Sequence, residues 1–298
     1  MKQQTMTPLT PDLWVVQSRS LLLNSGVFIS QGQACLIDPG LYPDEIERLG
    51  QWVKDQRAVP SVILLTHGHW DHLLGPERFP GAKIMAQAGY EQVVRKDEIG
   101  ILKAIARWET ENNVVRKNPF VIPLPAEVCH ETLRLNLGEL TLELIHVPGH
   151  AADQLVAYHA ASGTLWASDI LSDVEIPFVS DHLAAYEKTL VRLADLDIRA
   201  LVPGHGSPTK DAEEIQTRFA RDRAYLSELS AKVSEAVRAG KSVAETVAVC
   251  AALCYRNPAD NAFYHQLNVE SAYLEWGGEA DPQQFGWARD WEKYPSSN

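Results

Sequence analysis

The stretch Thr66-His67-Gly68-His69-Trp70-Asp71-His72 follows a short apolar run, Val62-Ile63-Leu64-Leu65. The apolar run has the length and the β-branched content of a buried strand. The residues after it offer three imidazoles and one carboxylate within six positions, and these groups are the ligands that zinc and iron take in proteins. Because α/β folds place their chemistry where a strand ends and a loop begins, the stretch predicts a metal site at the end of a core strand.

The spacing within this stretch predicts more than one metal. His67 and His69 are two residues apart, so an extended backbone would place their side chains on the same side. Asp71 and His72 are adjacent and are expected to diverge if the loop turns helical. A catalytic zinc site takes three protein ligands and a water. Four local ligands, with more from elsewhere in the chain, therefore predict two metals.

Three further candidate ligands each follow a short apolar run. Two of them are the histidines that end Val147-Pro148-Gly149-His150 and Val202-Pro203-Gly204-His205. Pro and Gly stop a strand and set a tight turn, so each His is expected to project from a strand end. The third is the aspartate that ends Leu165-Trp166-Ala167-Ser168-Asp169. The chain thus repeats one design, in which a strand delivers a ligand at its end.

With these positions in this order, the chain resembles the metallo-β-lactamase superfamily over roughly residues 10 to 208. The resemblance implies an α/β fold of the αββα type, in which two β-sheets face each other with helices outside. It also implies two metal sites. Asp38, in Leu36-Ile37-Asp38-Pro39-Gly40, matches a family position near the metals and is expected to orient a ligand. The implied ligands are His67, His69 and His150 for the first metal, Asp71, His72 and His205 for the second, and Asp169 as the bridge.

The length of the chain and the change in its residue pattern predict two regions. A chain of 298 residues can hold one large domain and an extension. We assign residues 1–208 to the metal-binding domain and residues 209–298 to an all-helical extension, with helical spacing over 211–256 and a further helix over 259–276. In some superfamily hydrolases a similar extension covers the metal cleft. A stabilising or dimerising role is the alternative, which leaves a homodimer open.

Other segments have simpler predictions. Residues 87–112 are expected to be helical and to overhang the site, because they follow the first ligand loop. A helix is predicted to begin near Pro43, and a strand is predicted over residues 21–29. Cys250 and Cys254 lie four residues apart, a spacing that puts both on one helix face, where we expect apolar core.

Composition argues against several classes of partner. The net charge of −12 disfavours binding to phosphate backbones, so no nucleic-acid partner is expected. The longest apolar runs are far shorter than a membrane span, and residues 1–10 lack the apolar core of a signal peptide. We therefore expect no membrane partner and a cytoplasmic location.

The ligand set predicts a metal-dependent hydrolase acting on a small-molecule substrate. Two divalent metals lower the pKa of a shared water and give hydroxide near neutral pH; zinc is the first choice, with iron or manganese as alternatives. Asp71 is the expected catalytic residue, because it would orient the nucleophile and accept a proton. Asp169 would fix the metal separation at roughly 3.5–4 Å. His182 is the candidate for substrate contact, and the histidines without a ligand context are His130, His146, His159 and His265.

Differences between this sequence and known branches of the superfamily narrow the range of expected substrates. True metallo-β-lactamases usually lack an aspartate where Asp169 stands, flavo-diiron proteins place a glutamate at the position of His69, and acyl-homoserine lactonases place a tyrosine at that of Ser172. Glyoxalase-II-like hydrolysis of a thioester or related acyl substrate is therefore the leading expectation. Glutathione-binding residues cannot be matched, so another carrier such as coenzyme A stays open. Candidates for contact with an anionic carrier are Arg218, Arg221 and Arg223.

Three alternatives stay open. A mononuclear iron persulfide dioxygenase shares much of the ligand set, and bound iron with sulfur-dependent oxygen uptake would identify it. A lactone or phosphodiester hydrolase of the same fold is the second. A binding module that keeps the metal site as a relic is the third, although intact ligands at all seven positions argue against it.

Overall fold

The computed structural model of the protein describes residues 5–279. Its first sheet has seven strands in chain order, from β1 to β7. Strands β1 to β4 pair antiparallel, and β4 to β7 pair parallel. The strands are β1 (Thr7–Pro8), β2 (Leu13–Gln17), β3 (Asn24–Ser30), β4 (Gln33–Ile37), β5 (Val59–Leu64), β6 (Lys83–Gln87) and β7 (Glu127–Cys129).

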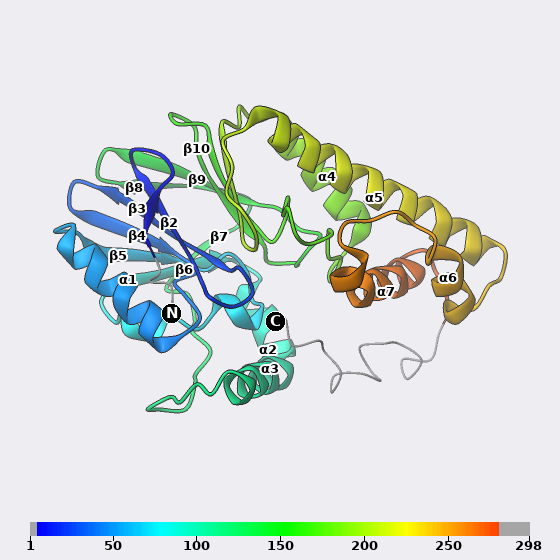
Figure 1. Ribbon diagram of the computed structural model, residues 1–298, viewed down its shortest axis with the longest axis horizontal. Coiled ribbons are helices and arrows are strands. Elements are labelled where there is room, and N and C mark those ends of the chain that lie inside the picture. Colours follow the sequence, from blue (N-terminus) through cyan, green and yellow to red (C-terminus); the bar gives the residue numbers. More distant parts are fainter. Residues whose placement is uncertain (1–4, 280–298) are drawn as a thin grey trace.

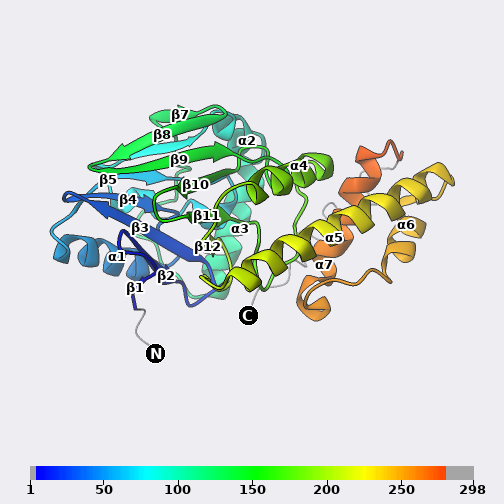
Figure 2. The ribbon, with the colours of Figure 1, turned by 90° about the horizontal axis from the view of Figure 1, so that it is seen from above.

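The second sheet has five strands in the order β12-β11-β10-β9-β8. Only β11 and β12 pair parallel in this sheet; its other neighbours are antiparallel. Figures 1 and 2 show the two sheets as stacked layers. The strands are β8 (Thr132–Leu137), β9 (Leu140–His146), β10 (Leu155–His159), β11 (Thr164–Ser168) and β12 (Ala200–Pro203).

Alternation along the strands builds the layers. Successive side chains of a strand point to opposite faces, and in β5 Val62 and Leu64 enter the core between the sheets while Ile63 joins the core under the outer helices. In β10 Leu155 faces the inner core, and Val156 faces the helices outside the second sheet. Both faces of each sheet are therefore covered, which explains why the central strands read as continuous apolar runs.

Helices cover the outer face of each sheet, as the αββα prediction requires. The helices on the side of the first sheet are α1 (Pro43–Asp55), α2 (Tyr90–Lys96) and α3 (Glu98–Glu111), and those on the side of the second are α4 (Leu183–Ala194), α5 (Ala212–Arg238), α6 (Val243–Cys250) and α7 (Pro258–Glu275). Short 3-10 turns, η1 (Trp70–His72) and η2 (Pro76–Arg78), follow β5. Figure 1 shows α1 to α3 below the sheets and α4 and α5 above and to the right. The mixed α/β fold class, with its C-terminal helical region, is confirmed.

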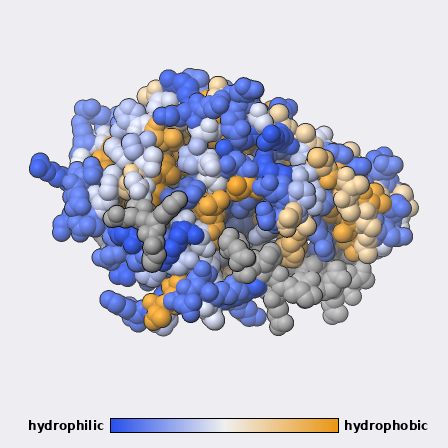
Figure 3. All heavy atoms as spheres, in the orientation of Figure 1, coloured by the Kyte–Doolittle hydropathy of each residue, from blue (hydrophilic) through white to orange (hydrophobic). Residues whose placement is uncertain are grey.

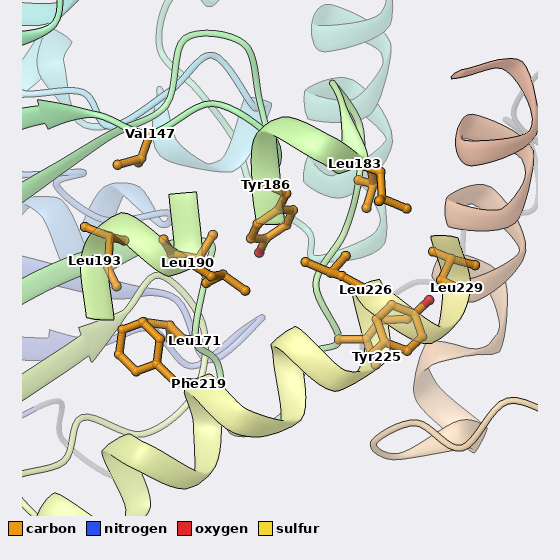
Figure 4. Close-up of a cluster of buried hydrophobic side chains, with 14 of the residues drawn as sticks. Val147, Leu171, Leu183, Tyr186, Leu190, Leu193, Phe219, Tyr225, Leu226 and Leu229 are labelled. Carbon is orange, nitrogen blue, oxygen red and sulfur yellow. The ribbon is translucent and has the colours of Figure 1, made fainter. Parts of the chain in front are cut away.

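The C-terminal helices share a core with the sandwich. One cluster of buried apolar side chains runs from the outer face of the second sheet through α4 to α5, α6 and α7. Figure 4 shows part of it, with Phe219 of α5 beside Leu171 and Tyr225 and Leu229 farther along the same helix. The division of the chain at residue 208 stays a prediction, but α5 and α7 pack against α4 of the sandwich, and α6 packs against α5 and α7.

Two local predictions differ from the structure. The strand expected over 21–29 begins at Asn24, because Leu21 and Leu22 have φ angles of 61° and 49° that no strand accommodates. The prediction that both cysteines share a buried helix face is wrong for Cys254. Helix α6 ends at Cys250, so the four-residue spacing no longer places the two on one face, and Cys254 is exposed.

The face of the molecule drawn in Figure 3 is mostly hydrophilic. Hydrophobic residues are more frequent over the C-terminal helices at the right. Within residues 5–279 we find no helix that combines the length and the apolar character needed to cross a membrane.

Candidate metal centre

The seven predicted ligands converge at one edge of the sandwich. They follow the C-terminal ends of β5, β9, β11 and β12, and Asp38 follows β4. The ligand atoms fall into two groups, and within each group all of them lie within 4.8 Å of one another. The first group is His67, His69, His150 and Asp169, and the second is Asp71, His72 and His205.

Asp169 stands between the two groups. Its Oδ2 atom lies 3.2 Å from Nε2 of His72 and 3.5 Å from Nε2 of His67. The same oxygen is 3.5 Å from Nε2 of His150 and 3.6 Å from Nε2 of His205. One carboxylate oxygen thus faces imidazoles of both groups, which is the position predicted for a bridging ligand.

Each imidazole uses one ring nitrogen for a contact with the surrounding protein and turns the other toward the centre. Such partners fix the orientation and tautomer of a metal-binding histidine. In four of the rings Nδ1 makes the outer contact; in His69 the outer nitrogen is Nε2. The contacts are His67 with Thr66 Oγ1 (3.1 Å), His69 with Ser180 Oγ (3.4 Å), His72 with Asp38 Oδ2 (2.9 Å), His150 with the carbonyl of Phe178 (3.0 Å) and His205 with the carbonyl of Leu21 (2.8 Å).

Local backbone geometry aims these side chains. Asp71 and His72 were expected to diverge, yet in the tight turn η1 the Oδ2 atom of Asp71 lies 3.8 Å from Nε2 of His72. A register shift between Trp166 and Ser168 interrupts the pairing of β11 with β12. Ser168 there has a φ of 54°. Because such an irregularity bends the strand and redirects the next side chain, Asp169 turns into the centre.

Charge and burial make the two groups electrostatically different. Burial drives the pKa of His67 well below its usual range and lowers the pKa of His150 to about 3. Burial also acts to lower the pKa of His72 and His205, but the facing carboxylates outweigh it and hold both pKa values well above the usual range. The shifts favour neutral imidazoles at His67 and His150, whereas at His72 and His205 a bound cation would compete with protons.

The residues at the centre fit a divalent metal. Within the described residues, Nε2 of His67 and Oδ1 of Asp169 are buried without a hydrogen-bond partner. Buried polar atoms nearly always have a hydrogen-bond partner. A bound cation would supply the partner that these two atoms lack. A set of imidazoles and carboxylates suits zinc, iron or manganese. The centre therefore offers both the donors and the unsatisfied atoms that a divalent cation requires.

The other predicted residues lie outside the two groups. His182 is the N-cap residue that precedes α4, and its Nδ1 lies 2.9 Å from Oε1 of Glu275 on α7. His146 contacts the carbonyl of Ala152 at 2.8 Å. Arg218 is buried and bound to Glu214 and to two backbone carbonyls, so it is not available to an anionic carrier. The remaining candidates for that role are the exposed Arg221 and Arg223.

Several groups at the site carried no sequence signal that we recognised. The hydroxyls of Thr66 and Ser168 lie near Nδ1 of His67, at 3.1 and 3.4 Å. Backbone carbonyls such as that of Phe178 have no signature in a sequence. Glu175 was also missed: burial raises its pKa to about 7, with His205 lowering it and Asp169 raising it. A carboxylate six residues after a predicted ligand was the only hint.

Comparisons with known proteins agree with this geometry. The family model described as the metallo-beta-lactamase superfamily matches residues 21–205. A beta-lactamase-like protein 2 homolog of Drosophila melanogaster is 29% identical over 64% of this chain, and the match spans 59% of the fly protein. The acyl-coenzyme A thioesterase MBLAC2 of Homo sapiens is 22% identical over 65% of this chain and 72% of its own length.

Solved structures share the fold. A metallo-beta-lactamase family protein from Thermus thermophilus superposes with a TM-score of 0.66 and 22% identity, over 92% of this chain and 98% of that one. The sec-alkylsulfatase Pisa1 from Pseudomonas sp. gives a TM-score of 0.73 at 16% identity, over 94% of this chain and 51% of its own. At these identities the likeness is one of fold alone.

Proposed function

This chain belongs to the metallo-β-lactamase superfamily, and from that premise we propose that it is a metal-dependent hydrolase of acyl thioesters. The observation that carries the proposal is the position of Asp169, whose Oδ2 atom faces imidazoles of both ligand groups within 3.6 Å. Members of this superfamily normally bind divalent metals, and the orphaned atoms of His67 and Asp169 are consistent with that.

We assign the residues to two metal positions. The first would be held by His67, His69 and His150, and the second by Asp71, His72 and His205, with Asp169 shared between them. Zinc is the expected metal, and iron or manganese would suit the same donors. Divalent metals bound there would supply Lewis acidity and a water of lowered pKa.

The remaining chemistry belongs to side chains of this protein. Asp71, with Oδ2 3.1 Å from Nε2 of His205, accepts a proton at its carboxylate from the attacking water. In thioester hydrolysis the water oxygen forms a bond to the acyl carbon, the carbon–sulfur bond breaks, and the thiol leaves with a proton. Asp38, Thr66 and Ser168 hold the imidazoles in orientation while this happens.

Substrate is expected to approach from the side where the ligands are least buried. His69 and Asp169 are partly exposed, whereas the other five are buried. Next to them lie the exposed Ser180 and the ring of Phe178, whose centroid is 6.4 Å from that of His69. The ring of Tyr264 on α7 is 5.4 Å from Phe178. We propose that this aromatic pair receives the apolar part of the acyl group.

The thioester is preferred over other acyl substrates for two reasons. Human and bovine relatives at 22% and 24% identity are acyl-coenzyme A thioesterases. The hydroxyl of Ser172, at the position where lactonases of this fold carry a tyrosine, donates to the carbonyl of His205 at 2.8 Å. It is buried and engaged there, so it offers no substitute for a tyrosine in the cleft.

A substrate panel tests the proposal. Metal-free protein, prepared with a chelator, is reloaded with zinc, manganese or iron. It is then assayed against acyl-CoA and acyl-glutathione thioesters, an acyl-homoserine lactone, a phosphodiester and an alkyl sulfate. We expect thiol release from the thioesters to exceed turnover of the others and to return only on reloading. Iron-dependent oxygen uptake with a persulfide, or preferred turnover of the lactone, phosphodiester or sulfate, would contradict it.

A further inference from the structure

The loop between Asp169 and α4 provides a contact that orients a predicted ligand. The carbonyl of Phe178 lies 3.0 Å from Nδ1 of His150 and can accept its proton. With the proton on Nδ1, the lone pair of Nε2 points to the centre. The Nε2 atom lies 3.5 Å from Oδ2 of Asp169 there. The position of the Phe178 peptide therefore decides where Nε2 of His150 points.

Asn268 of α7 holds the two neighbours of Phe178. Its Oδ1 atom accepts a hydrogen bond from the backbone N–H of Val179 at 2.7 Å, and its Nδ2 donates to the carbonyl of Pro177 at 2.7 Å. Asn268 is fully buried. A single amide thus bonds to the residues immediately before and after Phe178. The Val179 N–H belongs to the same peptide group as the Phe178 carbonyl, so this bond fixes the orientation of that carbonyl.

A chain of buried hydrogen bonds fixes the orientation of this amide in turn. Nε2 of His265 donates to the carbonyl of Cys250 at 3.0 Å, which leaves Nδ1 of His265 to accept from the hydroxyl of Tyr225 at 2.9 Å. The Tyr225 oxygen can then accept from Nδ2 of Asn268 at 2.9 Å. Because each donor has one acceptor, the side-chain amide of Asn268 cannot flip without losing bonds at both ends.

We propose that Asn268 is a positioning residue of the metal centre, acting on His150 through the Phe178 carbonyl. The inference rests on the proposed role of His150 as a ligand. It gives the C-terminal helices a function in metal binding that the family ligand set does not include. Removing a residue that orients a ligand typically lowers metal affinity by about 10- to 100-fold. Asn268 acts one residue further away, so we expect its loss to lower metal affinity about tenfold.

Asn261 provides a matched control. It also lies on α7, is buried, and bonds to the same loop, but at Val174 and Ile176 (3.0 and 3.4 Å), which do not flank Phe178. Losing either asparagine loosens the tie between α7 and the loop. Only the loss of Asn268 should release the peptide that contacts His150.

The experiment compares full-length Asn268→Asp and Asn268→Ala with Asn261→Ala. Far-UV circular dichroism establishes that each variant folds. One readout is the rate at which a chelator removes Co²⁺ or Zn²⁺ from each loaded protein. The other needs no metal: in metal-free protein labelled with ¹⁵N at histidine, the solvent exchange of the His150 Nδ1–H proton is measured by NMR.

We expect both Asn268 variants to lose one class of bound metal about tenfold faster than wild type, with faster exchange of the His150 proton. Asn261→Ala should keep wild-type values in both readouts. Unchanged rates in folded Asn268 variants, or equal losses in Asn261→Ala, would overturn the proposal. If the Asn268 variants do not fold, Tyr225→Phe decides: a smaller change in the same direction supports the idea, and no change overturns it. Should wild type bind no metal, the proposed function fails, while proton exchange still tests the contact with His150.

Discussion

Oδ2 of Asp38 lies 2.9 Å from Nδ1 of His72 and accepts a hydrogen bond from the hydroxyl of Thr66 at 2.7 Å. Oδ1 of Asp38 accepts from the backbone N–H of Thr66 at 2.9 Å. One buried carboxylate from the end of β4 therefore binds both the first and the last residue of the Thr66–His72 stretch. These contacts would allow Asp38 to orient the imidazole of His72, and that role stays a prediction.

Asp38→Asn should weaken metal binding while keeping the fold. An amide of the same size can accept only through one atom, so either His72 or Thr66 loses its partner. We expect metal affinity to fall about 10- to 100-fold, measured by competition with a chromophoric chelator. Asp44→Asn is the control, because Asp44 is an acidic residue on α1 paired with exposed Arg48. Equal metal affinity in wild type and Asp38→Asn would contradict the assignment.

Gly204→Ala should damage the centre through a collision. A Cβ atom at Gly204 would lie 2.0 Å from Oδ1 of Asp169, closer than any real contact. We expect loss of bound metal and a destabilisation of about 1–3 kcal/mol from overpacking, measured by elemental analysis and urea unfolding. Gly81→Ala serves as the control, since its Cβ would meet nothing within 4 Å. Wild-type metal content in Gly204→Ala would show that Asp169 can move freely.

Asp169→Ala should lose far more activity than His182→Ala. Asp169 faces both ligand groups, whereas His182 is half-exposed and paired with Glu275. Wild type should also contain two metals per chain, and Asp169→Ala fewer. The measurements are turnover of the best substrate in the panel and elemental analysis of protein purified without chelator. Equal losses of turnover with intact metal in both variants would disprove the assignment, as would one metal per chain under saturating supply.

Asp153 should make the protein less stable as the pH rises. Burial raises its pKa from 3.8 to about 7, although the backbone N–H groups of Asp153 and Gly68 act in the opposite direction. Between those values the folded chain holds a proton that the unfolded chain has released. Stability from this group is therefore complete below about pH 4 and is lost as the pH rises through 7.

The variant Asp153→Asn removes this titration. The free energy of unfolding of metal-free wild type and variant is measured in urea at pH 5, 6, 7 and 8. Relative to wild type, the variant should gain roughly 1–4 kcal/mol across this range. Because other titrating groups are common to both chains, they cancel in the difference. A difference that stays constant with pH would show that Asp153 is ionised throughout.

The sequence predicted the fold, because the fold depends on local patterns, whereas the ligand set stays a prediction whose seven side chains lie close together in the structure. The apolar run before His67 and the Pro-Gly turns before His150 and His205 each indicate a strand end, and parallel or face-to-face strands bring such ends together. The resemblance to a known family supplied the order of the ligands. The prediction of Asp38 as a neighbour of the ligands agrees with its contact to His72.

Contacts between distant segments outside the ligand motifs could not be predicted. The tie from Asn268 to Pro177 and Val179 joins residues about 90 positions apart through backbone atoms, which leave no mark on composition or periodicity. Arg218 looked like a surface cation because helical spacing does not reveal which face a neighbouring loop will cover. The exposed Cys254 shows the same limit, because its burial depended on a helix end that the spacing did not indicate.

The last prediction concerns the helices after Lys210. They bury the outer face of α4, where Tyr186, Leu190 and Leu193 pack in one apolar cluster with residues of α5 (Figure 4). Side chains from the same region hold the loop after Asp169: Arg256 donates to the carbonyl of Glu175 at 2.6 Å, and Asn268 donates to that of Pro177. Removing these helices would expose apolar surface and release the loop.

A chain ending at Lys210 is therefore expected to aggregate or to bind a hydrophobic dye far more strongly than the full chain. Any fraction that stays in solution should bind metal more weakly, because the loop after Asp169 is released. It should also hydrolyse the substrate panel with altered preference, because the aromatic pair of Phe178 and Tyr264 has lost Tyr264. Size-exclusion chromatography, dye fluorescence and KM across the panel measure these effects. If the shortened chain is monodisperse, with the metal content and the KM values of the full chain, the helices are an appendage and the 1–208 division describes an independent domain.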